Sequence, residues 1–227
     1  MEILVRIACI VIGYVLGLFQ TAYLYGRLHG IDIREHGSGN SGTTNALRVL
    51  GKKAGFIVFL GDLLKATLAC MIGRAIGMVF YPELVYPLIL WSGLGVVIGH
   101  NFPFYMNFKG GKGIAATAGV ILGLLDYRIM LICLVAFLLC VVITGYVSLG
   151  SLIVVVLFFT SFLVLGLTGR IENPATHVAD GGKPMTEAYV IIFIFAALAF
   201  YRHKANIIRL AEGTENKIFS KKKEIES

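Results

Sequence analysis

The sequence predicts an all-α integral membrane protein with about seven transmembrane helices, its N-terminus outside and its C-terminus cytoplasmic. Composition is the first reason: 57% of the 227 residues are hydrophobic and 15% are charged, whereas a soluble domain carries about 25% charged residues. The second reason is a series of apolar runs that approach the roughly 20 residues needed to cross a bilayer. The third is that most of the 20 Lys and Arg residues lie in polar islands between these runs.

Seven apolar spans are expected along the chain. They cover residues 3–25, 54–80, 84–99, 114–127, 128–145, 148–167 and 186–201. The spans at 84–99, 114–127 and 186–201 are short for a full crossing, so tilted helices or flanking re-entrant segments are expected there, and a count of five or six stays open. The first span contains Arg6 and lacks an A-x-A-like cleavage site, which predicts a transmembrane helix rather than a removed signal peptide.

Three polar islands set the expected topology: residues 26–53, 100–113 and 201–227. Seven spans place all three on one side of the membrane, and that side is expected to be the cytoplasm because cytoplasmic loops retain Lys and Arg. The 168–185 loop then lies outside. Residues 1–227 are expected to form a single polytopic membrane domain with three cytoplasmic motif loops. The net charge of +7 is attributed to these loops and not to nucleic-acid binding.

Charged residues and cysteines also occur inside the spans. Asp62 and Lys65 are three residues apart in the second span, so their side chains can pair across one helical turn. An intramembrane pair is a functional hypothesis by default, because burying either charge alone is costly; a purely structural pair fits the sequence as well. The cysteines lack a C-x-x-C pair and are expected to be small buried hydrophobic residues. They are Cys9, Cys70, Cys133 and Cys140.

The first candidate site is a glycine-rich run in the first island. It reads Gly37-Ser38-Gly39-Asn40-Ser41-Gly42-Thr43-Thr44-Asn45 and is followed by Arg48. Its G-x-G-x-x-G spacing does not indicate a dinucleotide fold, because an apolar helix precedes it instead of a strand. Glycines still let backbone N–H groups converge on an anion, and Arg48 can hold two phosphate oxygens. The alternative is a polar loop that caps the next helix.

The second candidate site lies between the third and fourth spans. It comprises Gly99-His100-Asn101-Phe102-Pro103 and Phe108-Lys109-Gly110-Gly111-Lys112-Gly113. Two lysines separated by glycines at an expected helix start suit a second phosphate. The pattern is not a Walker A loop, because Gly113 and not Ser or Thr follows Lys112. The alternative is a positively charged turn without a ligand.

The third candidate site runs from Tyr201 to Arg209 and continues to Gly213-Thr214-Glu215. His203 and Asn206 are expected on one helical face, and Asn206 shares a face with Arg209. His203 could be a base, a donor or a phosphate ligand, whereas a lone His beside a membrane is more often a surface polar group. No carboxylate cluster near the islands offers hard oxygen ligands, so no metal is expected. The Lys221–Lys223 run is expected to be a solvated tail near anionic lipid.

Together the three islands resemble those of the bacterial integral-membrane acyl-phosphate:glycerol-3-phosphate acyltransferases, over nearly the whole chain. The motifs that carry the resemblance are Gly37 to Asn45 with Arg48; Gly99 to Gly113; and His203, Asn206, Arg209, Leu210 and Gly213-Thr214-Glu215. Asp62-Leu63-Leu64-Lys65 is also similar. The chain departs from the usual family pattern at Thr43 (usually Ala), Ala66 (Gly), Ala116 (Thr) and Asn216 (Pro). None of these departures removes a charged or hydrogen-bonding residue of the site.

The resemblance implies transfer of a fatty acyl group from acyl phosphate to the 1-hydroxyl of sn-glycerol 3-phosphate. The products would be lysophosphatidate and phosphate, in the first step of phospholipid synthesis. It further implies no cofactor, an acyl chain that lies between helices and is reached from membrane lipid, and a place in the cytoplasmic (plasma) membrane of a bacterium. Coupling to an acyl-phosphate-forming enzyme is a possible partnership.

The resemblance also implies roles for individual residues. Expected catalytic residues are Ser38, Arg48, Lys112, His203 and Asn206; expected substrate-binding residues are Gly39, Asn40, Asn45, Lys109, Gly110, Gly111, Arg209 and Glu215. No Ser–His–Asp set is visible, and no His has an Asp five positions later, so direct attack by the hydroxyl is expected. The base would be a phosphate oxygen of the donor or, alternatively, His203.

A transporter of an anionic phosphorylated solute is the alternative function, because it also predicts basic loops and glycine-rich breaks. Transporters usually show inverted repeats with broken helices near mid-membrane. Here the polar islands lie at the ends of the spans and on one side, which favours catalysis at the inner leaflet.

Overall fold

The computed structural model describes residues 1–179 and 182–218, and this part of the chain is helical. Its α-helices are α1 (Glu2–Gly17), α2 (Thr21–Leu28), α3 (Thr43–Leu50), α4 (Lys52–Phe80), α5 (Val85–Asn101), α6 (Ile114–Gly123), α7 (Tyr127–Thr144), α8 (Val147–Leu167), α9 (Gly182–Arg202) and α10 (Lys204–Ala211). Three 3-10 turns stand between them: η1 (Ile33–Glu35), η2 (Pro82–Leu84) and η3 (Phe104–Met106). The predicted all-α class is confirmed. Part of the 168–185 loop and the Lys221–Lys223 run lie outside the described residues.

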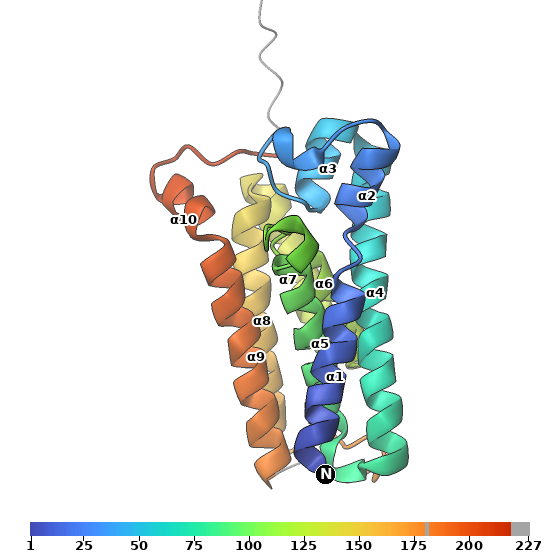
Figure 1. Cartoon of the computed structure of the whole chain (residues 1–227). Coiled ribbons are helices and arrows are strands. Elements are labelled where there is room, and N and C mark those ends of the chain that lie inside the picture. Colours follow the sequence, from blue (N-terminus) through green and yellow to red (C-terminus); the bar gives the residue numbers. More distant parts are fainter. Residues whose placement is uncertain (180–181, 219–227) are drawn as a thin grey trace, which may run out of the picture.

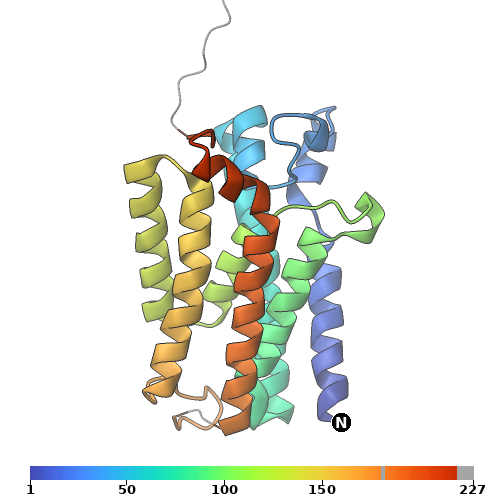
Figure 2. The same ribbon diagram turned by 90° about the vertical axis from the view of Figure 1, so that its left-hand side faces the viewer.

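The long helices run roughly along one axis, and the three eight-residue helices gather at one end of the bundle. Figures 1 and 2 show α2, α3 and α10 at this end, while the N-terminus lies at the opposite end. All three polar islands therefore meet at the same end, which we call the island end. That the island end faces the cytoplasm stays a prediction.

Six helical segments of the described residues are long and apolar enough to cross a membrane. They are Glu2–Leu28, Lys52–Phe80, Pro82–Met106, Tyr127–Thr144, Val147–Leu167 and Pro184–Arg202. The span expected at 114–127, which is short for a full crossing, forms only the 10-residue α6, so the described residues hold six candidate spans in place of about seven. The chain on both sides of this short helix is held by the protein. The buried Gly110 and Gly111 lie just before α6. At its other end, Arg74 of α4 donates hydrogen bonds to the carbonyls of Gly123 and Leu124 (3.4 and 2.8 Å).

The predicted first span at 3–25 is interrupted, which the apolar pattern did not indicate. The chain leaves α1 at Gly17 and re-enters a helix at Thr21. Open carbonyls inside a membrane are costly unless protein groups satisfy them. Here Lys65 donates to the carbonyl of Phe19 (2.6 Å) and the side chain of Gln20 donates to that of Gly17 (3.1 Å). The break is therefore held by buried polar side chains.

Close packing of α1 on α5 fixes the centre of the bundle. The span that contains α5 is 78% buried, more than any other candidate span. Gly13 and Gly17 of α1 face Gly95 and Gly99 of α5, and a Cβ on any of these glycines would overlap a backbone carbonyl of the other helix. Such spacing lets two membrane helices approach closely. The contact sets the position of the end of α5, where the second island begins.

Two expectations about the spans are confirmed. Asp62 and Lys65 form a buried ion pair of 2.8 Å across one turn of α4. The four cysteines are free and buried among the helices.

Candidate functional site

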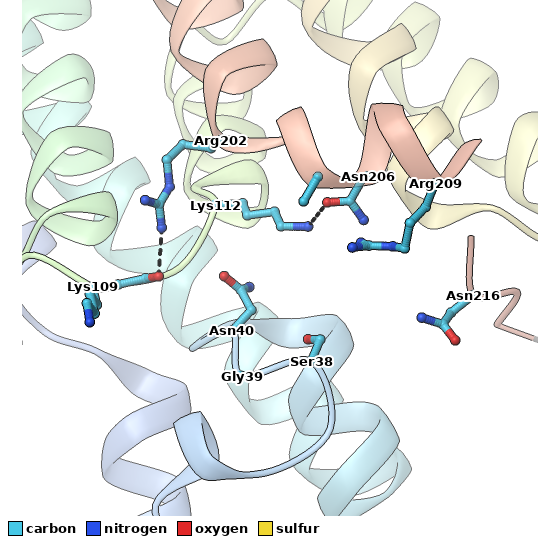
Figure 3. Close-up of a pocket in the computed structure, with 11 residues that line it drawn as sticks. Ser38, Gly39, Asn40, Lys109, Lys112, Arg202, Asn206, Arg209 and Asn216 are labelled. Carbon is cyan, nitrogen blue, oxygen red and sulfur yellow. Dashed lines mark hydrogen bonds between the residues drawn. The ribbon is translucent and has the colours of Figure 1, made fainter. Parts of the chain in front are cut away.

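A pocket of about 390 Å³ opens at the island end, and its walls come from all three polar islands. The lining residues are Ser38, Gly39, Asn40, Lys109, Gly110, Lys112, Arg202, Ala205, Asn206, Arg209 and Asn216. Figure 3 shows Lys112, Asn206 and Arg209 facing Ser38 and Asn40 across the pocket. Segments that are far apart in the sequence thus form one polar, cationic cavity.

The first island contributes a loop whose shape is set by glycines and by one asparagine. Gly37 and Gly39 have φ values of 62° and 68°, a region that favours glycine. The Asn45 side chain accepts a hydrogen bond from the Ser38 N–H (2.8 Å) and donates to two backbone carbonyls earlier in the loop (3.1 and 3.0 Å). The N-cap of α3 is Gly42, which makes no side-chain cap. The hydrogen bonds of Asn45 therefore fix the backbone of the loop that lines the pocket. Because the N-cap of α3 is a glycine, the alternative that a polar side chain of the loop caps this helix is not supported.

The second island contributes a segment that is clamped on both edges. The N–H groups of Gly110 and Gly111 donate to the carbonyls of Asn101 and His100, each at 3.1 Å. On the other edge, Arg202 donates to the carbonyls of the same two glycines, each at 2.9 Å. A side chain at Gly111 would overlap the His100 ring. The clamp fixes the backbone from which the next lysine reaches the pocket.

The third island holds that lysine through a chain of hydrogen bonds. Lys112 donates to the side-chain oxygen of Asn206, whose amide nitrogen donates to Glu215 (2.7 Å). The Glu215 carboxylate also accepts from Arg209 (2.8 Å) and from Ser148 (3.1 Å). Glu215 thus positions Arg209 and Asn206, while the hydrogen-bond partner of Lys112 is an amide and not a carboxylate.

Burial is the main cause that lowers the pKa of the Lys112 ammonium; together with the opposing charge of Glu215 and the charges of Arg209, Arg202 and Arg48, it brings this pKa to about 8. Three arginines and one carboxylate act on this amine, so the positive charge around it suits an anionic ligand such as a phosphate group, whose binding would favour the ammonium form.

His203 lies at the junction of α9 and α10, with 2% of its surface exposed. Its Nδ1 atom is 2.8 Å from the Ala199 carbonyl, which can only accept, so Nδ1 carries the proton and a neutral ring leaves Nε2 as an acceptor. Burial, followed by the charge of Lys112, lowers the His203 pKa to about 4. At neutral pH the ring is therefore uncharged and weakly basic.

Most of the predicted site residues line the pocket: Ser38, Gly39, Asn40, Lys109, Gly110, Lys112, Asn206 and Arg209. Arg48, Asn45, Gly111, His203 and Glu215 do not. Arg48 is exposed on α3, and Asn45, Gly111 and Glu215 are occupied by the contacts described above. Among the residues described, no three His, Cys, Asp or Glu side chains gather to hold a metal ion.

Three lining residues had no role assigned from the sequence: Arg202, Ala205 and Asn216. Arg202 and Ala205 lie within the third candidate site, and Asn216 directly follows Glu215. Assigning a role to every polar residue of that segment, and not only to the motif positions, would have found Arg202 and Asn216. Asn216 also adds a polar side chain at a position where the resembling family usually has Pro.

Comparisons with known proteins agree on one family. The model of the family described as glycerol-3-phosphate acyltransferase matches residues 7–213. A glycerol-3-phosphate acyltransferase of Clostridioides difficile is 40% identical over 98% of this chain and 100% of its own length. One of Streptococcus thermophilus is 40% identical over 91% and 90%.

Solved structures give the same picture. The crystal structure of PlsY, an integral membrane glycerol 3-phosphate acyltransferase, in its glycerol 3-phosphate form, superposes with a TM-score of 0.77 at 30% identity, covering 93% of this chain and 94% of that one. Its lysophosphatidic acid form superposes with a TM-score of 0.73 and the same coverage.

Proposed function

The chain belongs to the glycerol-3-phosphate acyltransferase family, and from this premise we propose that it transfers a fatty acyl group from acyl phosphate to the 1-hydroxyl of sn-glycerol 3-phosphate. The products are lysophosphatidate and inorganic phosphate. The observation that carries the proposal is the shared pocket, into which the second and third islands bring Lys109, Lys112, Arg202 and Arg209, while the first island brings Ser38. Both substrates carry phosphate groups, and several cations in one cavity suit both.

The proposed reaction is a direct transfer. The glycerol 1-hydroxyl oxygen attacks the acyl carbon, the bond from that carbon to the phosphate oxygen breaks, and the hydroxyl proton passes to a phosphate oxygen. Acyl phosphate is a mixed anhydride with a good leaving group, so the protein needs mainly to orient the two substrates and to stabilise developing negative charge. The cationic pocket with Ser38 opposite is suited to both tasks.

We assign Ser38, Arg48 and Lys112 to the donor phosphate, with the backbone of Gly39, Asn40, Gly110 and Gly111 close by. His203, Asn206 and Arg209 would orient glycerol 3-phosphate, with Lys109 as a further cation. Asn45 and Glu215 would act by holding these groups in place. The neutral, weakly basic ring of His203 supports a role as a hydrogen-bond acceptor for a substrate hydroxyl, while a donor phosphate oxygen takes the proton.

We further propose that the reaction takes place at the inner leaflet of the cytoplasmic membrane of a bacterium, within one membrane domain. The acyl chain would enter from the lipid between helices. An acyl-phosphate-forming enzyme would supply the donor, and the product would feed phospholipid synthesis.

The test is an assay of purified protein with labelled glycerol 3-phosphate and either palmitoyl phosphate or palmitoyl-CoA. We expect lysophosphatidate from palmitoyl phosphate alone, because a thioester brings no phosphate oxygen to its reacting carbon to accept the proton. Equal rates with both donors would overturn the phosphate-assisted mechanism and leave the acyltransferase class intact. Flux of glycerol 3-phosphate into liposomes without product would instead identify a transporter.

A further inference from the structure

A cluster of buried polar side chains lies beneath the pocket, where α1 is interrupted. It joins Gln20 and Thr21 from the start of α2, Asp62 and Lys65 from α4, and His100 from the end of α5, each no more than 8% exposed. The interruption between α1 and α2 lies near the island end (Figure 1). None of these residues lines the pocket, and the proposed reaction does not use them.

The Lys65 ammonium is the centre of this cluster. It pairs with Asp62 (2.8 Å), donates to the Phe19 carbonyl at the helix break (2.6 Å) and lies 3.0 Å from Nδ1 of His100. An ammonium group can only donate, so Nδ1 of His100 is the acceptor of that bond. Asp62 is held in turn by the Thr21 hydroxyl (3.1 Å). One side chain of α4 therefore connects the break between α1 and α2 with the end of α5.

His100 carries this connection to the site. Its carbonyl accepts from the Gly111 N–H (3.1 Å) and from the Gln20 side chain (3.1 Å). Its ring stands where a side chain on Gly111 would have to lie. His100, which Lys65 holds in place, thus supports the Gly110–Gly111 segment that leads to Lys112.

Stability alone is a weak reason for this arrangement. A buried ion pair seldom stabilises a protein more than well-packed apolar side chains of the same volume, since desolvation offsets the attraction. The contacts of Lys65 are also directed: they reach the helix break and the residue that supports the Gly110–Gly111 segment. Arg74, a half-buried cation of α4, donates its hydrogen bonds to the end of α6.

We propose that Lys65 is a positioning residue for the acyl transfer: through His100 it holds the Gly110–Gly111 segment, and thereby the ammonium of Lys112, in the geometry that binds phosphate. This proposal rests on the proposed function for its consequence, but the positioning itself is measurable without turnover. Asp62 holds the Lys65 side chain in place through their ion pair.

Hydrogen exchange read by mass spectrometry tests the positioning directly. In Lys65→Met, peptides that cover residues 107–113 should exchange about tenfold faster or more, while peptides from α8 keep their wild-type rate. Lys65→Arg should restore most of the protection. Arg74→Met is the control, because it removes a half-buried cation from the same helix and should leave residues 107–113 unchanged. The double variant Asp62→Asn/Lys65→Met removes both charges, so it avoids the unpaired buried carboxylate that could unfold the single variant. It should show the same local effect on residues 107–113.

Faster exchange throughout the chain in the double variant, unchanged exchange at 107–113, or an equal effect of Arg74→Met would each overturn the proposal.

A double-mutant cycle then tests the link to Lys112. Lys65→Met should lower kcat/KM for glycerol 3-phosphate about tenfold or more in the wild-type background, but less than about threefold in Lys112→Ala, because the two changes act on one element. Equal losses in both backgrounds would show that Lys65 acts independently of Lys112. If the wild-type protein itself fails to turn over, the proposed function falls, whereas the exchange experiment still decides whether Lys65 holds the segment.

Discussion

We expect phosphate binding in the pocket to depend most on Lys112. Its ammonium is partly buried, and its hydrogen-bond partner is the amide of Asn206 and not a carboxylate, so its charge is available to a ligand. Lys112→Ala should nearly abolish turnover. A charge-assisted contact to phosphate is worth roughly 1.5–3 kcal/mol, about ten- to a hundred-and-fifty-fold in rate, and more if the contact forms only in the transition state. Lys53→Ala is the control, since Lys53 is an exposed lysine at the same end of the bundle. If the folded Lys112→Ala and Lys53→Ala variants lost the same amount of turnover, the loss would reflect the overall positive charge of this end of the bundle and not a contact of Lys112 with phosphate.

The pH dependence follows from the lowered pKa of Lys112. Below a pKa of about 8 the free enzyme holds an ammonium, and above it the amine is neutral and binds a dianion poorly. Glycerol 3-phosphate is already mostly dianionic above about pH 6, so kcat/KM should fall as the pH rises through about 8. Lys112→Arg stays charged at these pH values and should lose this descending limb, whatever its absolute rate. If kcat/KM of Lys112→Arg still falls above about pH 8, the titrating group is not Lys112.

The role of His203, as general base or as ligand of glycerol 3-phosphate, can be decided by kinetics. Since burial and the charge of Lys112 hold its pKa at about 4, wild-type enzyme should show no titration of this ring between pH 5 and 8. His203→Gln should raise KM for glycerol 3-phosphate and change kcat little. The measurement is a pair of saturation curves, one for each substrate. A collapse of kcat with unchanged KM would show that the ring removes the proton.

At the scale of elements, the contact between α1 and α5 places the second island. Gly13→Leu should force the helices apart, because the new side chain would meet the Ser92 carbonyl, and overpacking of this kind costs about 1–3 kcal/mol. We expect a lower Tm and a loss of activity. Val11→Leu is the matched control on the lipid-exposed side of α1. Unchanged thermal unfolding of Gly13→Leu in detergent would argue against close packing.

At the scale of the whole molecule, the orientation in the membrane is testable by labelling. In a background without the four native cysteines, an impermeant maleimide should label Thr176→Cys on intact cells, because the 168–185 loop is expected outside. Lys52→Cys should react only after the membrane is opened. Both positions are exposed in the structure. Labelling at position 52 and not at 176 would invert the topology.

The sequence by itself determined the membrane class, the long spans and the three islands. Each depends on local pattern: apolar runs of bilayer length, and cations with glycines at the ends of those runs. It also gave the Asp62–Lys65 pair, because helical spacing brings residues three apart together. The glycine-rich cationic segments were noticed for the same reason, since glycines beside cations can form an anion-binding backbone, whereas the roles of their individual residues came from the resemblance to the acyltransferase family.

Only the tertiary structure decided how these pieces act together. Arg202 lines the pocket because α9 ends beside the Gly110–Gly111 segment, and Lys65 meets His100 because α4 and α5 pack at that height; neither contact leaves a trace in the local sequence. The same holds for the break after Gly17, where Lys65 of α4 and the neighbouring Gln20 satisfy backbone carbonyls, and for the end of α6, where Arg74 of α4 does so. An apolar pattern records which residues prefer lipid or core, whereas the partner of each buried polar group is set by packing between helices.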